Sequence, residues 1–133
     1  MAEPIIFQDK DIVYYADTCE PLKEAAQRNE VTLRGWARGN YPGLPLPRRM
    51  LPQLRSIGLW DADRPQSWGL DLHCNEGIEL TYLAKGKTAF EVDGQNWMLS
   101  KGNLTITRPW QFHRVGNPTI GASRLIWPEL WRR

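Results

Sequence analysis

The sequence predicts an all-β protein that carries one short N-terminal helix. From residue 54 onward, short runs of alternating apolar and polar residues follow one another along the chain. Turn signals such as Asp93-Gly94 separate these runs at intervals of about 8–12 residues. Only residues 17–30 have a convincing helical pattern. Many short strands divided by such turns are typical of a β-sandwich or a β-barrel.

Composition indicates one globular domain. A chain of 133 residues suits a single domain, and 41% hydrophobic with 24% charged residues is the balance of a soluble protein. The net charge is +2 and no run of five like charges occurs, which argues against a nucleic-acid-binding surface. No segment approaches the ~20 apolar residues that span a membrane, so we expect no membrane contact.

The cysteines and the N-terminus indicate a cytoplasmic protein. Cys19 and Cys74 are too few for a disulfide framework, and we expect two reduced thiols. The N-terminus carries acidic residues early and lacks the long apolar segment of a secretory signal.

Residues 11–16 and 31–37 predict two strands that flank the helix of residues 17–30. Asp17 or Thr18 can cap this helix, because their side-chain oxygens accept hydrogen bonds from first-turn N–H groups. A proline also suits the first turn, where its missing N–H costs nothing. The apolar residues that share one face of the helix are Leu22, Ala25 and Ala26.

Residues 40–53 predict an extended connection, because they hold four prolines and a glycine. This arm could be a plain surface loop or could lie over the mouth of a pocket. These patterns divide the chain into two parts. Residues 1–53 form the N-terminal strands, the helix and the arm, which pack on a barrel. Residues 54–133 form the barrel core, and both parts make one domain overall.

The barrel strands follow one another closely. Residues 85–87, Asp93-Gly94 and residues 100–103 predict tight turns, since glycine adopts positive φ without steric cost. The predicted strands are residues 54–60, 68–75, 77–84, 88–94, 95–99, 104–108 and 123–127.

Seven tryptophans are an unusual number for a chain of this length. Large aromatic side chains fill cores, but they also line small-molecule pockets and interfaces. We expect most of them in the core and a few in a pocket or an interface. They are Trp36, Trp60, Trp68, Trp97, Trp110, Trp127 and Trp131.

Candidate site residues gather around one of the two histidines. Strand alternation over residues 68–75 would place polar side chains on one face and apolar ones on the other. Glu79 lies four residues beyond Asn75, so it would lie on the same face as Asn75 unless Gly77 introduces a bulge. The expected polar face holds Asp71, His73 and Asn75. The expected apolar face holds Leu70, Leu72 and Cys74.

The second histidine, His113, lies far away in sequence, but a closed β architecture could bring it near His73. Two imidazoles and one carboxylate are a suitable ligand set for a first-row divalent metal. A strand histidine can equally be a hydrogen-bonded core residue, so both interpretations stay open.

The spacing resembles the two motifs of the cupin family. The first motif, G-x5-H-x-H-x(3,4)-E-x6-G, fits at His73, Glu79 and Gly86. Asn75 stands at its second histidine, and Ser67 stands at its first glycine.

The second motif, G-x5-P-x-G-x2-H-x3-N, fits at Gly102, His113 and Asn117. Arg108 and Trp110 replace its proline and its second glycine. The resemblance implies a cupin-type double-stranded β-helix, a jelly-roll barrel, which agrees with the strand pattern.

Three stretches narrow the resemblance further. "LRSIGLWDAD", "HCNEGIELTYLAKG" and "LTITRPWQFHRVGNP" are similar to the N-terminal sensor domains of AraC-type transcription regulators. Such domains bind a small-molecule effector or mediate dimerisation. The family's helix-turn-helix part has no counterpart in this chain. We therefore expect a separated sensor domain or a stand-alone relative, which forms a homodimer and does not bind DNA on its own.

The resemblance also implies a site. Arg108 could clamp an anionic effector or form a surface salt bridge, and Trp110 could stack on the effector or pack. Alternative roles are a small metal-dependent cupin enzyme of dioxygenase or isomerase type, and an oligomerisation module. No cofactor is required, but zinc, iron, manganese or nickel could bind. The expected ligand-binding residues are His73, Asn75, Glu79, Arg108, Trp110 and His113. The possible metal ligands are His73, Glu79 and His113.

Overall fold

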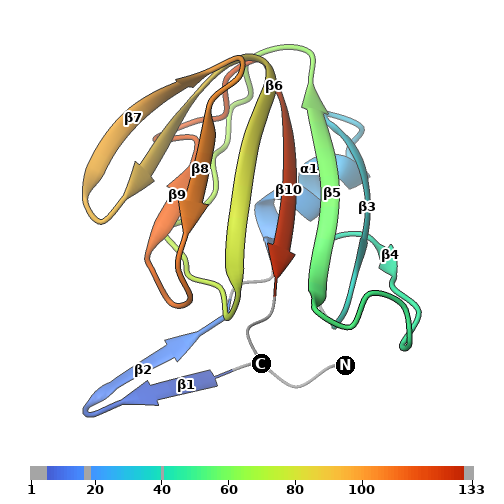
Figure 1. Cartoon of the computed structure of the whole chain (residues 1–133). Helices are drawn as coiled ribbons and strands as arrows, with labels where there is room; N and C mark the ends of the chain where they lie inside the picture. The colour runs from blue at the N-terminus through green and yellow to red at the C-terminus, as the bar shows by residue number, and fades with distance from the viewer. Residues whose placement is uncertain (1–5, 17–18, 40, 131–133) are drawn as a thin grey trace.

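The structure is a computed structural model that describes residues 6–16, 19–39 and 41–130. Figure 1 shows a β-barrel with one helix and a two-stranded hairpin that projects beside it. The described helix is α1 (Glu20–Gln27). The described strands are β1 (Ile6–Asp9), β2 (Ile12–Tyr15), β3 (Thr32–Ala37), β4 (Leu44–Pro45), β5 (Leu54–Ala62), β6 (Ile78–Val92), β7 (Gln95–Ser100), β8 (Leu104–Thr107), β9 (His113–Val115) and β10 (Ser123–Leu130).

The long strand β6 joins the two sides of the barrel. Its first half pairs with β10 and β8, and its second half pairs with β7 and β9, all antiparallel. The main strand order is β4-β3-β5-β10-β6-β7, with β8 and β9 joined to β6 outside this path. Two layers of strands around one core form a jelly-roll barrel. The predicted all-β barrel with one short N-terminal helix is therefore confirmed.

Helix α1 closes the barrel interior, and Figure 1 shows it behind β10 and β5. Leu22 and Ala25 are buried in the barrel core and Ala26 packs against that core, as the helical pattern predicted. Cys19 occupies the N-cap position of the helix, and the predicted caps Asp17 and Thr18 lie outside the described residues. No described helix is long and apolar enough to cross a membrane.

The tryptophans divide between core and surface. Trp60, Trp68 and Trp127 belong to the barrel core or pack against it. Trp36 and Trp97 are more than half exposed. The prediction of core positions for most tryptophans therefore holds for only part of the described ones. Trp131 lies outside the described residues.

The predicted turn at residues 85–87 is wrong. Strand β6 continues through Gly86 as one strand of 15 residues. Gly86 has φ +77°, and the carbonyl oxygen of Ala122 lies 1.9 Å from the position that a Cβ would take. The glycine therefore marks the point where β6 passes from one sheet to the other, and the backbone just before β10 leaves no room there for a side chain.

The predicted strand at residues 68–75 is also wrong. Only isolated bridges form in this segment, between Cys74 and Ala16 and between His73 and His113. Leu72 is 50% exposed, although it was expected on a covered apolar face. Without a continuous hydrogen-bonded ladder, nothing forces successive side chains to opposite faces.

Other local predictions are confirmed. Asp93 and Gly94 form the hairpin between β6 and β7 with φ of 49° and 76°. The strands predicted at 11–16, 31–37, 54–60, 95–99 and 104–108 are present, and β10 extends the strand predicted at 123–127. Strands β1 and β9 were not expected.

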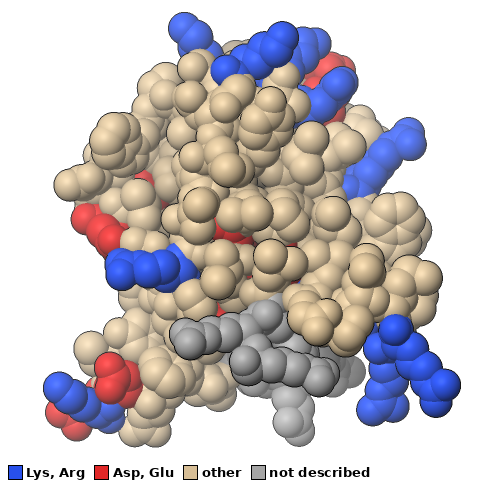
Figure 2. Space-filling view, in the orientation of Figure 1, with Lys and Arg blue, Asp and Glu red and all other residues tan. Residues whose placement is uncertain are grey.

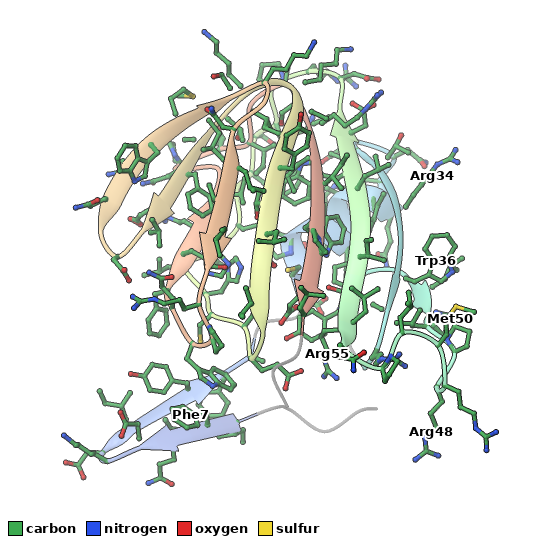
Figure 3. The ribbon with its side chains drawn as sticks, viewed as in Figure 1. Phe7, Arg34, Trp36, Arg48, Met50 and Arg55 are labelled. Atoms are coloured by element: carbon green, nitrogen blue, oxygen red, sulfur yellow. The ribbon has the colours of Figure 1, made fainter. Side chains whose placement is uncertain are left out.

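The hairpin of β1 and β2 touches the barrel through aromatic rings. Phe7, labelled in Figure 3, stacks on Trp110 with centroids 5.4 Å apart and an interplanar angle of 14°. Tyr14 lies 6.2 Å from the Trp110 ring and 5.8 Å from the Phe112 ring. These contacts fix the base of a hairpin whose other side chains are mostly exposed.

The proline-rich arm is irregular apart from β4, as predicted. One arginine holds it in place. The Arg38 guanidinium donates hydrogen bonds to the carbonyl oxygens of Pro47, Leu51 and Leu54, at 3.2, 3.1 and 3.0 Å. It also bonds the carbonyl oxygen of Met50. The arm is therefore anchored to the end of β3 rather than loose on the surface.

Candidate functional site

The fold brings the two sequence motifs together inside the barrel. The backbones of His73 and His113 exchange two hydrogen bonds, each 2.9 Å long. Their rings lie 4.4 Å apart, centroid to centroid. Glu79, near the start of β6, places a carboxylate oxygen 3.4 Å from the Nε2 atom of His113. Residues 40 positions apart in sequence thus form one cluster, because β9 pairs with the irregular segment before β6.

Asn75 completes the cluster at the position of the missing histidine. Its side-chain NH₂ donates a hydrogen bond of 3.0 Å to the second carboxylate oxygen of Glu79. The Thr81 hydroxyl donates to the first oxygen at 3.4 Å. Asn75, Thr81 and His113 are at most 2% exposed. The four motif positions therefore form one group, in which three residues are buried and the Glu79 side chain is 15% exposed. We call it the motif cluster: His73, Asn75, Glu79 and His113.

Both imidazole rings are oriented by backbone carbonyl groups. The Nδ1 atom of His73 lies 2.7 Å from the Asp71 carbonyl oxygen, and that of His113 lies 2.8 Å from the Gln111 carbonyl oxygen. A carbonyl oxygen can only accept, so each Nδ1 carries a hydrogen. In a neutral ring, the lone pair then belongs to Nε2. In His113 this atom faces the Glu79 carboxylate 3.4 Å away, so a hydrogen bond between them requires the charged imidazolium, in which Nε2 also carries a hydrogen.

The environment keeps Glu79 in its charged form. Burial alone would raise the pKa of its carboxyl group. The hydrogen bond with His113 and the charges of both histidines outweigh that effect and hold the pKa below its usual value. The cluster therefore offers a ligand one buried carboxylate, rather than a neutral acid.

Three members of the motif cluster, His73, Asn75 and Glu79, line a small interior cavity. The cavity has a volume of about 30 Å³, which is room for about two water molecules. Its apolar wall includes Leu22 from α1 and Trp60 and Trp127 from the sheet. Tyr41 and Pro42, at the start of the proline-rich arm, also line it. One end of the arm thus lines the cavity.

A second buried polar group lies beside the cavity, and the sequence had not indicated it. Glu129 is fully buried, and it accepts hydrogen bonds from the Gly77 N–H at 3.2 Å and the Tyr41 hydroxyl at 3.5 Å. The Arg55 guanidinium lies 5.1 Å above the Tyr41 ring and forms an ion pair of 2.5 Å with Glu76. The Glu76 side chain in this ion pair is only 18% exposed.

One sequence signal could have found Glu129. Leu125, Trp127 and Glu129 alternate along β10, and all three are buried. A carboxylate at the inward parity of a strand is uncommon and indicates a partner inside. Tyr41 and Arg55 carry no comparable signal, since neither lies in a regular alternating position.

Three of the expected ligand-binding residues do not line the cavity: His113, which lies behind it in contact with Glu79, and Arg108 and Trp110. Arg108 is 78% exposed at its side chain and lies 3.9 Å from Asp93, which fits the surface salt bridge that was the alternative. The Trp110 ring stacks on Phe7 of the hairpin, although its backbone N–H donates to the Asn75 carbonyl oxygen at 2.8 Å. The structure thus brings together His73, Asn75, Glu79 and His113, and leaves Arg108 and Trp110 outside.

The motif cluster does not fit a metal centre as it is arranged. Zinc-type centres need several ligand atoms within about 2.3 Å of one point. Among the described residues, no group of three or more His, Cys, Asp or Glu side chains offers this geometry. Asn75 replaces one histidine and presents its NH₂ group, a donor, to Glu79. Metal binding by His73, Glu79 and His113 would therefore require their side chains to reorient.

These features define a small jelly-roll protein with a buried polar site. Residues 64–128 match the family described as Cupin domain. This match spans both motifs, and it agrees with the barrel topology. The chain therefore has the cupin fold.

Several solved cupin structures are similar to this chain. A predicted oxalate decarboxylase from Thermotoga maritima is 18% identical, with 67% of this chain and 76% of that chain covered and a TM-score of 0.56. KdgF from a Halomonas species is 18% identical, with 79% and 82% covered and a TM-score of 0.56. The cupin domain of an XRE family transcriptional regulator from Enterobacter cloacae is 10% identical, with 78% and 99% covered and a TM-score of 0.55.

Identities this low show the common fold alone. A comparison with curated protein sequences finds no match to this chain. The solved relatives include both enzyme-like and regulator-type names, so the fold does not choose between those roles.

Proposed function

We propose that this chain is the ligand-sensing domain of an AraC-type transcription regulator and binds a small polar effector inside the barrel. The observation that carries the proposal is that His73, Asn75 and Glu79 line one wall of an interior cavity whose other wall is apolar. A few convergent polar groups in an apolar enclosure are typical of small-molecule sites. DNA binding would belong to a helix-turn-helix part beyond this chain.

The size of the cavity sets a condition on the effector. About 30 Å³ accommodates only a very small molecule. A larger effector needs the covering residues to move, and Tyr41 and Pro42 on the arm are the ones placed to do so. Ligand binding would then change the position of the arm, which gives a sensor domain a way to report occupancy.

Glu79 is the residue on which effector binding should depend most. Replacing Glu79 with Gln removes the buried charge while keeping the shape, so we expect an effector to bind at least about 10-fold more weakly. Trp60 and Trp127 line the cavity, so their fluorescence can report binding in a screen of polyols, amines and carboxylates.

The matched control is Glu91→Gln, which removes a carboxylate from the same strand β6. Glu91 pairs with Arg114 at 3.2 Å, and it does not line the cavity. Its effector affinity should equal that of the unchanged chain. Equal loss in both variants, or unchanged binding in Glu79→Gln, would place the binding site elsewhere.

A metal-dependent enzyme is the second candidate, and one observation favours it. Each histidine has its Nδ1 hydrogen held by a carbonyl group, the arrangement that metal-ligating histidines use to present Nε2. Against it stands the amide of Asn75, which donates to Glu79.

Elemental analysis of tag-free protein, with His73→Ala beside it, separates the two functions. We expect no stoichiometric metal in either protein, because Asn75 stands in place of one histidine and the side chains of His73, Glu79 and His113 are not arranged around one point. One equivalent of iron, manganese, nickel or zinc that disappears in His73→Ala would instead favour the enzyme and direct the work to substrate screens.

A further inference from the structure

Two polar atoms in the wall of the interior cavity have no hydrogen-bond partner among the described residues. They are the side-chain oxygen Oδ1 of Asn75 and the indole nitrogen Nε1 of Trp60. Both residues line the cavity, and each is 2% exposed. Buried polar atoms in folded proteins are nearly always paired, because an unpaired one costs free energy. The two atoms therefore indicate that the cavity suits a molecule that bonds to both of them.

The two atoms have opposite hydrogen-bonding character. A carboxylate can only accept, so the group that Asn75 directs at Glu79, 3.0 Å away, is its NH₂ group. The Asn75 atom that remains is the oxygen, which accepts. The indole N–H of Trp60 can only donate. A ligand that pairs both atoms must donate one hydrogen bond to Asn75 and accept another from Trp60.

The neighbouring tryptophans differ from Trp60 in this respect. The Trp127 indole N–H donates to the Ser56 hydroxyl at 3.2 Å. The Trp68 indole N–H donates to the Gln66 side-chain oxygen, also at 3.2 Å. The Trp60 ring packs between these two rings, with centroids 6.3 Å from Trp68 and 6.4 Å from Trp127. Because this packing restricts the ring, the cavity is the space in which a partner for its N–H can lie.

The charges around the cavity favour an uncharged ligand. An anion would meet the Glu79 carboxylate, and the described residues that line the cavity include no lysine or arginine. Figure 2 shows the Lys and Arg side chains of this view toward the edges of the molecule. A cation would find Glu79 already 3.4 Å from His113, and it could not accept from the Trp60 N–H. Neither kind of ion pairs both atoms.

We infer that the effector carries a neutral carboxamide group, which lies between Asn75 and Trp60. Its N–H donates to the Asn75 oxygen, and its carbonyl oxygen accepts from the Trp60 indole N–H. The cavity has room for about two water molecules, which matches the two polar atoms of a carboxamide better than the single oxygen of an alcohol. This inference rests on the proposed function, because it names the class of ligand for the same cavity.

Three probes of nearly the same shape test the inference. Acetamide donates and accepts, acetate is an anion that only accepts, and acetamidinium is a cation that only donates. We expect acetamide to bind the unchanged chain at least about 5-fold more tightly than either ion, since each ion leaves one buried atom unpaired. Titrations at constant ionic strength, followed by NMR of the tryptophan indole N–H signals, measure the three dissociation constants.

The Trp60 indole signal shows whether a probe binds at the inferred place. Trp60→Phe assigns this signal by its loss, and it removes the donor while keeping an aromatic ring. Acetamide should move the Trp60 signal downfield in the unchanged chain, as a new hydrogen bond does. In Trp60→Phe the dissociation constant for acetamide should rise about 5-fold.

Trp68→Phe is the matched control, because the Trp68 N–H already bonds Gln66 and Trp68 does not line the cavity. Its affinity for acetamide should equal that of the unchanged chain. The comparison of the three probes uses the unchanged chain alone, so it remains decisive if Trp60→Phe does not fold.

The possible failures of the inference and of the proposed function are distinguishable. Acetate or acetamidinium that binds as tightly as acetamide would overturn the carboxamide and leave the cavity as the effector site. Acetamide that binds without moving the Trp60 signal would also overturn it, and so would a hit in the wider screen when no probe binds. A chain that binds neither the probes nor any compound of the wider screen would overturn the proposed function together with this inference.

Discussion

Replacing Gly86 with alanine is expected to lower the free energy of unfolding by about 4 kcal/mol. Two costs add. The φ of +77° disfavours any residue with a Cβ, and the Ala122 carbonyl oxygen lies 1.9 Å from the position of that Cβ. Because this oxygen belongs to the backbone, relief requires the chain before β10 to shift away from β6. Chemical denaturation monitored by tryptophan fluorescence measures the change.

Gly94→Ala is the matched control for this experiment. Gly94 has nearly the same φ, +76°, but no atom lies within 4 Å of its Cβ position. Only the backbone cost remains, so the loss should be about 1 kcal/mol. Equal losses in the two variants would mean that the contact with Ala122 does not restrict position 86 and that only its φ matters.

Gly86 also illustrates how far the sequence can predict this fold. The motif spacing singled it out correctly, but the local pattern Lys85-Gly86-Lys87 predicted a turn. A single glycine looks the same at a hairpin and at a bend within a long strand, since both require positive φ. The difference depends on β10, which lies beside β6 and is distant in sequence.

Strands with a continuous ladder were predictable, and the segment before β6 was not. In β10, alternate residues from Ser123 to Glu129 are buried, as the period of two requires. In residues 68–75 the backbone bonds its neighbour only at intervals, so His73, Cys74 and Asn75 are all buried in succession. Periodicity fails there because no neighbouring strand imposes it.

Motif spacing predicted one property of the candidate site, namely that the motif positions lie close together in the fold. His73, Asn75, Glu79 and His113 form one cluster. Motif spacing could not predict the second buried polar group beside the cavity, which includes Glu129. The packing of the arm and of β10 brings that group together.

The buried carboxyl group of Glu129 predicts how the stability of the fold depends on pH. Burial, with the nearby charges of Glu79 and Glu76, raises the pKa of Glu129 to about 8. The Gly77 N–H and Arg55 oppose this shift only in part. A carboxyl group in an unfolded chain has a pKa near 4.3. Between these two values the folded chain binds a proton that the unfolded chain releases, so stability falls as the pH rises.

Glu129→Gln should remove this dependence. In the unchanged chain, the free energy of unfolding should fall by up to about 1.4 kcal/mol for each pH unit between about pH 5 and pH 8. Glutamine keeps an oxygen to accept from Gly77 and Tyr41 but carries no proton to lose. Denaturation curves across this range should therefore show a flatter slope in the variant, and a more stable protein than the unchanged chain at pH 8.

Glu24→Gln provides the comparison, because the Glu24 side chain is 63% exposed on α1 and should leave the slope as it is. A steep slope that persists in Glu129→Gln would show that another group binds the proton. A flat slope in the unchanged chain would mean that Glu129 is ionised when buried. Its charge would then have to be balanced by Arg55, which would have to divide its interaction between Glu129 and Glu76. The pH series therefore decides whether the cavity is bordered by one buried negative charge, at Glu79, or by two.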